Sequence, residues 1–420
     1  MAKNKHMSDI ITGLDIGSNS VRVAVGQFSI MRDEDNPTLQ IIAALDVPSE
    51  GVQKGQIISI EDTVSSVSNA LEQVEKIIGL PVSHIWVGVS GTQIISQESK
   101  GVIAVSRTDG EISEDDIERA VDAAKAVATP LNYDILHVLP RSFAVDGQTG
   151  IKDPVGMTGI RLEVDTKIIH SVSSHIKNLT KVVYRTGVDV DDFVLSILAA
   201  GEVVTNSRQK ELGCVVVNIG GPTTSLVVYE DGDVIHTSVV PIGSSHITND
   251  LALGLKTSID IAERVKVEYG ACVSKGISKK EMIDLRDFGS DKSDVVSRYY
   301  VNQIIEARVS EILEKIDDEL SSIERSGMLP AGIIFIGGGA KIEGLVDTAK
   351  EVLSLPAQLG YPLGMDSISN KVNDVSFVSA IGLVKWGSTL LQSVRGRKKS
   401  INIGSKVGDT FRNVFKNLLP

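Results

Sequence analysis

The chain has 420 residues, of which 42% are hydrophobic and 23% charged, so we expect a globular protein of two or more domains and exclude a disordered one. The formal net charge is −12; residues 395–420 hold seven basic residues and one acidic residue, a net +6, which leaves −18 on residues 1–394. An acidic body with one basic end excludes broad nucleic-acid binding and favours contact of that end with an anionic surface.

The N-terminal segment MAKNKHMSDI has no apolar core, so it is not a signal peptide, and no run of 18 apolar residues could span a bilayer. The two cysteines, Cys214 and Cys272, do not supply a disulfide framework. A reducing cytoplasm is therefore the expected location.

The chain opens with a strand, a short glycine turn and a second strand, IITGLDIGSNSVRVAVGQF, at residues 10–28. Residues 61–78 then place apolar residues at alternating spacings of 3 and 4, which indicates one face of a helix that Gly79 ends. These residues are Val64, Val67, Leu71, Val74 and Ile78. The segment SHIWVGVSG predicts a further strand. Beyond it, Ser113 is a predicted helix N-cap, and Asp116 completes a variant of the capping box.

The second half of the chain repeats the opening pattern. Residues 213–240 predict strand, glycine turn and strand, followed by a tight Asp-Gly-Asp hairpin. The turn at 218–223 matches the turn at 15–20 in the form Asp/Asn-Ile-Gly-x-x-Ser/Thr, 203 residues apart. Residues 331–353 predict a buried strand, a triple glycine and a helix. Two homologous α/β halves that face each other would bring all three glycine turns to one cleft.

Such turns are typical of phosphate sites. Glycine lets backbone N–H groups approach a phosphate closely, a hydroxyl adds a donor, and an aspartate at the start can hold Mg²⁺ through water. A single glycine turn is as often only a hairpin, but two matched turns and a triple glycine are much harder to obtain by chance. The predicted nucleotide contacts are Gly17, Ser18, Asn19, Ser20, Gly220, Gly221, Thr223, Gly337, Gly338 and Gly339.

With these turns the chain resembles the actin superfamily of nucleotide-binding proteins. The turns at 15–20 and 218–223 are similar to its phosphate motifs, the triple glycine to its adenosine motif, and residues 375–387 to its second connecting helix. The segment IDIAERVKVEYG resembles its E-x-x-K helix, which implies that Glu263 and Lys266 flank the nucleoside. The resemblance further implies ATP or ADP as ligand, Gly243 as a contact, and Mg²⁺ held through water by Asp15. Asn218 stands where a second metal-facing aspartate is usual and is a poorer ligand.

Within this superfamily, residues 137–164 most closely resemble FtsA, the family of bacterial cell-division actin homologues. Residues 87–96 are also similar to FtsA, where a histidine often stands at the place of Gln93, and the resemblance runs in order from residue 11 to 420. It implies an α/β, actin-like (ribonuclease H-like) duplicated two-lobe fold with an FtsA-type inserted subdomain and a C-terminal amphipathic helix. The implied divisions are the first lobe at 8–83 and 165–205, the inserted subdomain at 84–164, the inner second lobe at 206–245 and 331–374, its outer part at 246–330, the connecting helix at 375–394, a basic linker at 395–404 and the amphipathic helix at 405–420.

The FtsA resemblance also implies partners. Residues 304–320 resemble the segment with which this family binds the C-terminal peptide of FtsZ, so Arg308 and Glu311 are candidate contacts. Charged residues on an exposed helix are usually only solvated, and that alternative stays open. The resemblance further implies filaments of the protein itself and contacts with later division proteins, and no nucleic acid.

Residues 405–420, SKVGDTFRNVFKNLLP, predict an amphipathic helix without reference to any family. Its apolar residues fall within an arc of about 140°, with basic residues on the other side, as in helices that lie in a membrane surface. The predicted contacts with anionic lipid are Val407, Phe411, Arg412, Val414, Phe415, Lys416, Leu418 and Leu419. The alternative is a helix docked on the protein's own core, which the basic, glycine-containing linker disfavours. FtsA has a membrane-targeting helix at this position.

These features favour an adaptor that binds ATP, polymerises on the cytoplasmic face of the cell membrane and anchors FtsZ filaments, the Z ring, at the division site. One alternative is a kinase- or phosphatase-type enzyme of the same superfamily, for which we find no convincing substrate base. The other is a MreB-like shape filament, which the insertion disfavours. Asn218 lacks a carboxylate and Pro222 lacks an N–H, so we expect ATP hydrolysis to be weak or absent.

Overall fold

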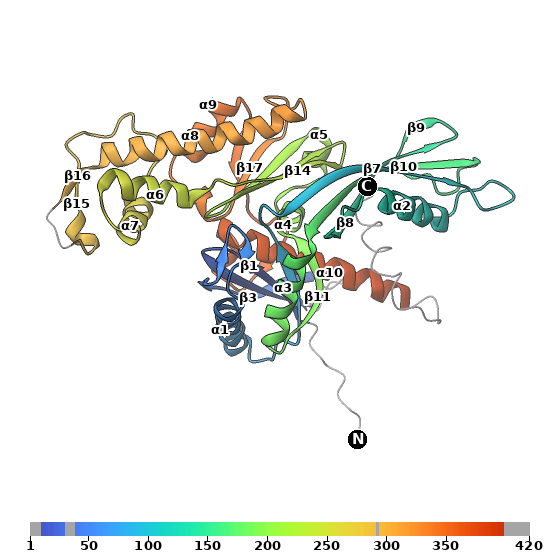
Figure 1. The fold of residues 1–420 in the computed structure, drawn as a ribbon, viewed down its shortest axis with the longest axis horizontal. Helices are drawn as coiled ribbons and strands as arrows, with labels where there is room; N and C mark the ends of the chain where they lie inside the picture. Colours follow the sequence, from blue (N-terminus) through green and yellow to red (C-terminus); the bar gives the residue numbers. More distant parts are fainter. Residues whose placement is uncertain (1–9, 30–37, 291–293, 399–420) are drawn as a thin grey trace, which may run out of the picture.

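The computed structural model describes residues 10–29, 38–290 and 294–398. The molecule is elongated, with two α/β lobes at its centre and a further subdomain at either end (Figure 1). A six-stranded and a five-stranded sheet form the two lobes, and a separate four-stranded sheet forms one of the end subdomains.

The first lobe is built on a mixed sheet. Its elements are β1 (Ile10–Ile16), β2 (Ser20–Ser29), β3 (Thr38–Pro48), β4 (Val52–Gln53), β5 (Gln56–Ile57), α1 (Ile60–Ile78), β6 (His84–Val89), α3 (Ser173–Arg185), β11 (Asp189–Leu195) and β19 (Asp366–Ser367). The sheet order is β11-β6-β1-β2-β3-β19, with β1 antiparallel to β2 and parallel to β6. The helices α1 and α3 cover its outer face, where Leu14 and Val67 belong to one buried cluster.

The second lobe contains a sheet whose central strand is buried on both faces. Its inner elements are β12 (Cys214–Ile219), β13 (Thr224–Glu230), β14 (Asp233–Val240), β17 (Gly332–Ile336), η2 (Gly338–Lys341), α9 (Leu345–Leu353) and β18 (Ala357–Leu359). The sheet order is β14-β13-β12-β17-β18. Val215 and Val217 of β12 pack toward the outer helices, whereas Val216 packs in the opposite cluster. A strand covered on both sides is apolar at every position rather than at alternate ones.

The outer part of the second lobe lies at the left of Figure 1. It consists of α6 (Ser244–Leu255), α7 (Ile259–Tyr269), β15 (Met282–Asp284), η1 (Leu285–Phe288) and β16 (Val295–Ser297), together with the start of α8 (Arg298–Ser322). Val301 and Ile305 of α8 share one buried cluster with Leu251 of α6. The long helix then continues over the inner sheet, so it joins the two parts of this lobe.

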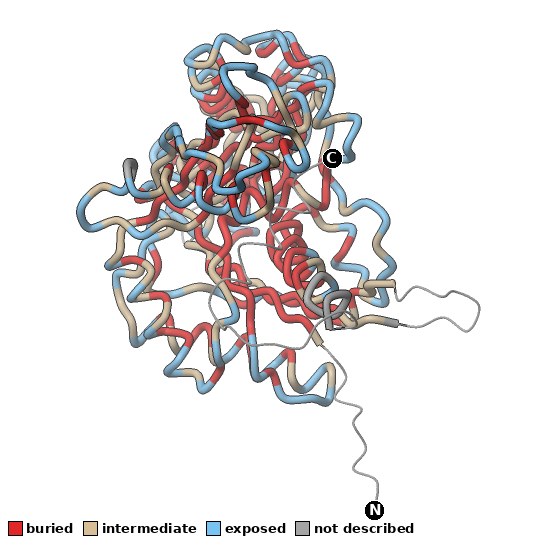
Figure 2. The backbone as a smooth tube through the Cα atoms, turned by 90° about the vertical axis from the view of Figure 1, so that its right-hand side faces the viewer, coloured by how far each residue is buried: buried red, intermediate tan, exposed pale blue. Residues whose placement is uncertain are grey.

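Two helices, α4 (Ser196–Val204) and α10 (Val378–Lys398), form a layer that both lobes share. One buried cluster joins Ala24 of the first sheet, Val216 of the second sheet and Ile381 of α10. The approach is close because glycine stands at the contacts. A side-chain carbon on Gly382 would overlap the Ala199 carbonyl oxygen of α4, and one on Gly13 of β1 would overlap the Ala380 carbonyl oxygen of α10. Figure 2 shows the buried segments gathered along this middle of the molecule.

Short elements connect this layer to the lobes. They are α5 (Ser207–Leu212), η3 (Asn370–Asn373) and η4 (Val375–Phe377). The connecting helix expected at 375–394 therefore corresponds to η4 followed by α10, which runs to Lys398.

The inserted subdomain lies at the right of Figure 1. Its elements are β7 (Ile94–Ala104), α2 (Glu114–Ala128), β8 (Tyr133–Val145), β9 (Gln148–Ile151) and β10 (Arg161–Val172), with the antiparallel order β7-β10-β8-β9. The expected division at 84–164 differs from this at both ends. The strand β6 pairs with β1 and β11 in the first lobe, so the subdomain begins after Val89, and β10 continues to Val172. Strand partners are set by distant segments, which the local pattern did not reveal.

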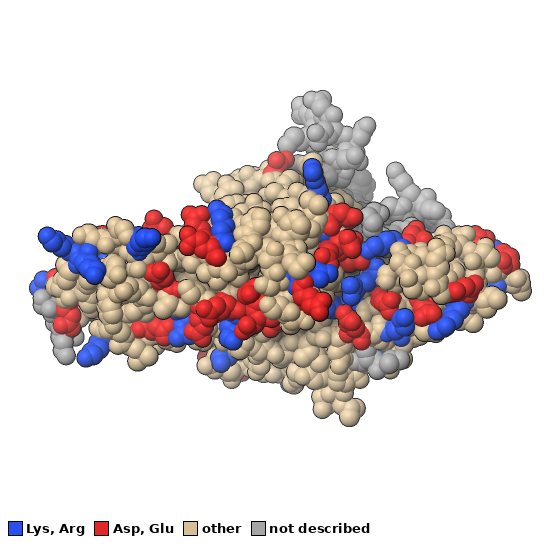
Figure 3. Space-filling view, turned by 90° about the horizontal axis from the view of Figure 1, so that it is seen from above, with Lys and Arg blue, Asp and Glu red and all other residues tan. Residues whose placement is uncertain are grey.

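The inserted subdomain also contacts the second lobe directly. Lys167 of β10 donates from Nζ to the carbonyl oxygen of Ile235 on β14 at 2.6 Å. Lys152 forms an ion pair with Asp233 at 2.5 Å. Burial lowers the pKa of Lys167, which is consistent with a carbonyl rather than a carboxylate as its partner. On the face in Figure 3, acidic and basic side chains lie next to one another along the length of the molecule.

Local predictions for two helices are confirmed. In α1 Gly79 ends the helix with φ 69°, as predicted, and Ser59, an N-cap that was not predicted, accepts a hydrogen bond from the Asp62 N–H. In α2 the capping box of Ser113 and Asp116 is present. These capping interactions join residues within four positions of the helix ends, so they depend little on tertiary contacts.

The capping carboxylate gives a prediction about pH. Asp116 is buried, accepts hydrogen bonds from the N–H and hydroxyl groups of both Ser113 and Ser106, and contacts Arg119. Burial raises the pKa of Asp116, but these hydrogen bonds outweigh burial and hold the pKa well below its ordinary value of 3.8. A carboxyl group with a lower pKa in the folded state stabilises the protein above its unfolded pKa, and this stabilisation is lost as the pH falls.

We therefore expect Asp116→Asn to lower the free energy of unfolding by about 2–4 kcal/mol at pH 7. The loss should be smaller at pH 3, as measured by urea unfolding at both pH values. The matched control is Asp115→Asn, because Asp115 is exposed in the same helical turn and should contribute less than about 1 kcal/mol. Equal losses in the two variants would contradict the assignment.

Candidate nucleotide-binding site

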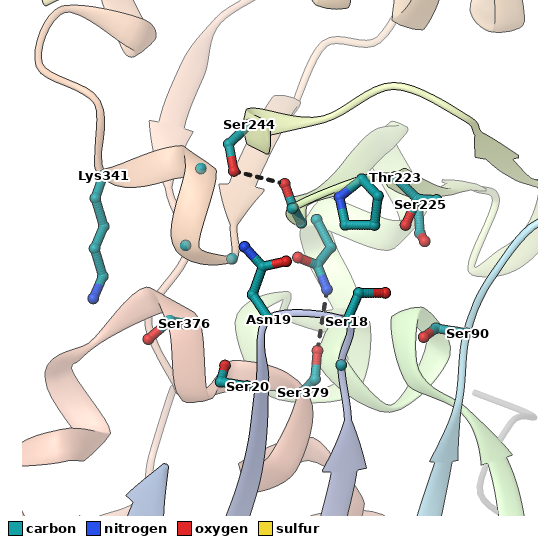
Figure 4. A pocket seen from close by; sticks show the side chains of 18 of the residues that line it. Ser18, Asn19, Ser20, Ser90, Thr223, Ser225, Ser244, Lys341, Ser376 and Ser379 are labelled. Atoms are coloured by element: carbon teal, nitrogen blue, oxygen red, sulfur yellow. Dashed lines mark hydrogen bonds between the residues drawn. The ribbon is translucent and has the colours of Figure 1, made fainter. Parts of the chain in front are cut away.

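A cavity of about 350 Å³ lies where the hairpin turns of the two lobes meet. Its walls come from the β1–β2 turn, the β12–β13 turn, the loop after β17, α7 and the start of α10 (Figure 4). The volume falls within the range of small-molecule pockets. The structure brings these predicted residues together in its lining: Asp15, Gly17, Ser18, Asn19, Ser20, Asn218, Gly220, Gly221, Thr223, Glu263, Lys266, Gly337, Gly338 and Gly339.

Both phosphate-type turns are closed by the same hydrogen bond. Gly17 donates from its N–H to the Ser20 carbonyl oxygen at 3.1 Å, and Gly220 donates to the Thr223 carbonyl oxygen at 2.9 Å. The internal repeat in the sequence is therefore also a repeat in geometry.

The two turns touch each other across the cleft. Asn19 donates from Nδ2 to the Ser245 hydroxyl at 3.5 Å, and a side-chain carbon on Gly221 would lie 2.5 Å from Asn19 Oδ1. Gly243, also predicted as a contact, is outside the lining. It lies behind the second turn, where a side chain would overlap the Gly221 carbonyl oxygen, so it supports the turn from outside the cavity.

Asn218 lines the cavity, but its amide is turned to the walls. It donates from Nδ2 to the Ser379 hydroxyl of α10 at 3.3 Å, the dashed bond to Ser379 in Figure 4. Its Oδ1 lies against Gly337, where no side chain would fit. The Nδ2 atom of Asn218 thus connects β12 to α10, and the side chain supplies no carboxylate for a metal ion.

Asp15 is the one carboxylate beside the first turn. It is 8% exposed and accepts a hydrogen bond from the Ser196 hydroxyl at 3.1 Å. Burial raises the pKa of Asp15, while Arg22 and the bond from Ser196 act in the opposite direction. Mg²⁺ bound to nucleotide phosphates needs only one or two carboxylates, so Asp15 fits a water-mediated contact. Among the described residues no group of three or more His, Cys, Asp or Glu side chains is placed to hold a metal by itself.

Glu263 and Lys266 of α7 form one wall. Lys266 Nζ lies 2.6 Å from Glu263 Oε2 and donates to the Thr248 hydroxyl at 2.9 Å, and Thr248 in turn donates to Glu263. Lys266 is buried and Glu263 is half exposed. The i, i+3 spacing that the sequence indicated does place both on one face, and it also neutralises their charges.

The cavity has lining residues that sequence reasoning missed. They include Arg22, Gly55, Ser90, Ser196, Lys341, Ser376 and Ser379. Arg22 and Lys341 had a local signal, because Arg22 lies two residues after Ser20 on one face of a strand and Lys341 lies two residues after Gly339. The others come from elements far away in the chain.

The remaining predicted residues lie elsewhere. Arg308 and Glu311 are on α8, where Arg308 forms a bidentate ion pair with Asp250 of α6 at 2.5 and 2.9 Å and a further pair with Glu311 at 2.5 Å. Glu311 keeps 46% of its side chain exposed, against 25% for Arg308. The membrane contacts named above, from Val407 to Leu419, lie outside the described residues.

Comparison with known proteins matches these features. The family model of cell division protein FtsA matches residues 215–382, and that of the SHS2 domain inserted in FtsA matches residues 91–170. Cell division protein FtsA of Pseudomonas aeruginosa PAO1 is 33% identical over 378 residues, which cover 90% of this chain and 89% of the relative. FtsA of Bacillus subtilis 168 is 35% identical over 391 residues, which cover 93% and 86%.

Solved structures with low sequence identity share the fold. A chain of the PilM–PilN type IV pilus biogenesis complex matches with TM-score 0.65 and 14% identity, over 90% of this chain and 98% of that chain. MreB5 of Spiroplasma citri matches with TM-score 0.54 and 13% identity, over 92% and 98%. The actin-like two-lobe fold with an inserted subdomain is thereby confirmed, while the expected C-terminal helix lies outside the described residues.

Neighbouring glycines of the third turn provide a matched pair of variants. Gly337 has φ 90°, and an added side chain would overlap Asn218, whereas Gly338 has open space around it. We expect Gly337→Ala to lower the stability of the nucleotide-free protein by about 1–3 kcal/mol. Gly338→Ala should change it by less than about 0.5 kcal/mol. Urea unfolding midpoints measure both, and equal midpoints would contradict the described turn.

Proposed function

This chain belongs to the FtsA family of cell division proteins, and we propose that it binds ATP between its two lobes and anchors FtsZ filaments to the cytoplasmic face of the cell membrane at the division site. The observation that supports ATP binding is that three glycine turns and α7 line one cavity. The protein assembles into filaments in this proposal, as the family resemblance implies.

The nucleotide proposal rests on geometry and on a structural neighbour. The glycines of two matched turns line the cavity, where the backbone can approach phosphate oxygens closely, and Lys266 with Glu263 forms the wall that would flank the nucleoside. Structures of MreB5 of Spiroplasma citri hold ADP and AMPPNP. Asp15 would hold Mg²⁺ through water when the metal is bound with the nucleotide.

Slow hydrolysis follows from the side chains that line the cavity. Its two carboxylates already have partners, since Asp15 accepts from Ser196, and Glu263 is bound to Lys266 and Thr248. Neither is therefore well placed as the base or water-positioning residue that phosphoryl transfer to water uses. Pro222 removes a donor from the second turn. We therefore favour ATP as a structural ligand over a kinase- or phosphatase-type enzyme.

The membrane proposal rests on the C-terminal sequence. Among the described residues, no helix is long and apolar enough to span a bilayer. The tail at 405–420 would lie in the membrane surface, where each Lys or Arg near anionic lipid contributes about 1 kcal/mol. Ordering the tail into a helix offsets part of this gain. A single tail would thus bind reversibly, and a filament with many tails would bind firmly.

The FtsZ proposal concerns the outer part of the second lobe. The bidentate pair with Asp250 fixes Arg308 between α6 and α8, and Glu311 stands half exposed beside it. We propose that Arg308 shapes this surface while Glu311 contacts the FtsZ peptide. A MreB-like shape filament is the weaker alternative, because the inserted subdomain at 91–170 matches FtsA.

Sedimentation with vesicles that contain phosphatidylglycerol tests the proposal that the protein links FtsZ to the membrane. We expect full-length protein to carry FtsZ into the pellet, and a chain ending at Lys398, which keeps α10 whole, to leave both proteins in the supernatant. Glu311→Lys should still sediment but weaken FtsZ recruitment by about tenfold, which corresponds to about 1.4 kcal/mol.

The control for Glu311→Lys is Asp318→Lys, a charge reversal at an exposed site two turns along the same helix. Equal sedimentation of the full-length and shortened chains would refute the membrane anchor. Equal loss of FtsZ with both charge reversals would refute the Glu311 contact.

The rate of phosphate release from ATP tests the slow-hydrolysis proposal. We expect a rate below about 1 s⁻¹ with Mg²⁺, under the ordinary range for enzymes. Asn218→Asp should raise it several-fold, because the change supplies a second carboxylate at the second turn. Asn206→Asp makes the same chemical change at a helix cap outside the cavity and should have no effect. A wild-type rate of an ordinary enzyme would overturn the proposal.

A further inference from the structure

We propose that Arg22 is the phosphate-binding cation of this cleft, and that it allows the cleft to hold a nucleoside di- or triphosphate without a divalent metal ion. This inference rests on the nucleotide binding proposed above and names the residue that would neutralise the phosphates.

The position of Arg22 brings its charge to the first turn. Arg22 on β2 pairs directly opposite Asp15 on β1, and both side chains line the cavity. A side-chain carbon built on Gly17 would lie 4.0 Å from Arg22 Nη1, so the guanidinium lies beside the turn that would hold phosphate. The ring of Phe377, with its centroid 6.0 Å from the guanidinium carbon, limits how far the group can turn away.

Two hydrogen-bonding groups on this side of the cavity are unused. Arg22 Nε and the Ser20 hydroxyl are both buried without a hydrogen-bond partner among the described residues. A guanidinium has five N–H donors, and leaving buried donors unpaired is unfavourable. Both groups belong to cavity-lining residues on the same face of β2, so a phosphate bound in the cavity would lie beside them.

The other two cations of the cavity lining already have carboxylate partners. Lys266 is bound to Glu263 at 2.6 Å, and Lys341 to Asp374 at 2.7 Å. Arg22 forms no salt bridge with a described carboxylate. Its neighbour Asp15 instead accepts from Ser196. A purely structural role for Arg22, as the ion-pair partner of Asp15, is therefore disfavoured, although the two charges do attract each other.

The residues that could hold a metal ion are correspondingly poor ligands. Asn218 supplies no carboxylate, and its Nδ2 atom donates to the Ser379 hydroxyl. Asp15 is buried, with its pKa raised chiefly by burial. The lining has three cations, of which Lys266 and Lys341 are paired with carboxylates, so Arg22 is the cation left to meet a phosphate. An arginine in this position supplies a charge that a bound metal ion would otherwise provide.

The experiment measures binding of ATP, ADP and adenosine to the full-length protein by calorimetry, with Mg²⁺ or with EDTA. For wild-type protein we expect the dissociation constant for ATP in EDTA to lie within about threefold of its value in Mg²⁺. Arg22→Gln should weaken ATP binding in EDTA by about 10- to 100-fold and leave adenosine binding within twofold. Arg22→Lys should keep most of the ATP affinity.

Arg185→Gln is the matched control, because Arg185 is exposed and pairs with Glu61 away from the cavity. Parallel loss of ATP and adenosine binding in Arg22→Gln would assign a structural role and overturn the proposal. The proposal would also be overturned if the wild-type dissociation constant for ATP were more than tenfold higher in EDTA than in Mg²⁺. This comparison needs no variant. A wild-type protein that binds neither ATP nor adenosine under either condition would overturn the nucleotide site itself.

Discussion

The packing of α10 against α4 and both sheets is the constraint on which the rest of the structure depends. Gly13 and Gly382 have no side chains at the contacts, so the helix backbone meets a strand on one side and a helix on the other. Residues from both lobes therefore enter one buried cluster. Because the lobes share this layer, the hairpins at their inner edges face each other, and the cavity arises between them.

The two turns at the cavity have the same backbone geometry but different surrounding side chains. Both turns are closed by the same hydrogen bond, as expected of a duplicated fold, but they differ in what surrounds them. The first turn has a buried carboxylate and an arginine; the second has an amide committed to α10 and a proline. These side chains underlie the proposal that the site holds phosphate and hydrolyses ATP slowly. This favours a protein whose nucleotide stabilises a conformation or a filament contact.

The structural features that could be predicted from the sequence are those set by residues close together in the chain. The two turns, the face of α1 and the capping box of α2 depend on residues a few positions apart. The misplaced boundary at residue 84 depends on strand pairing, which joins β6 to β1 and β11 across the chain. Ser379 reaches the cavity only because α10 packs against both lobes, and the pairing of Arg308 with Asp250 spans 58 residues. No local pattern carries that information.

The helix α10 has a mechanical consequence. Near its start Ser379 is bonded to Asn218 of the second turn, and beyond its end at Lys398 the chain continues into the basic tail. Tension applied to that tail would enter a rod that is buried in both lobes rather than a flexible loop. In the membrane-bound filament proposed above, α10 would therefore transmit force from the tail to Asn218 in the lining of the cavity.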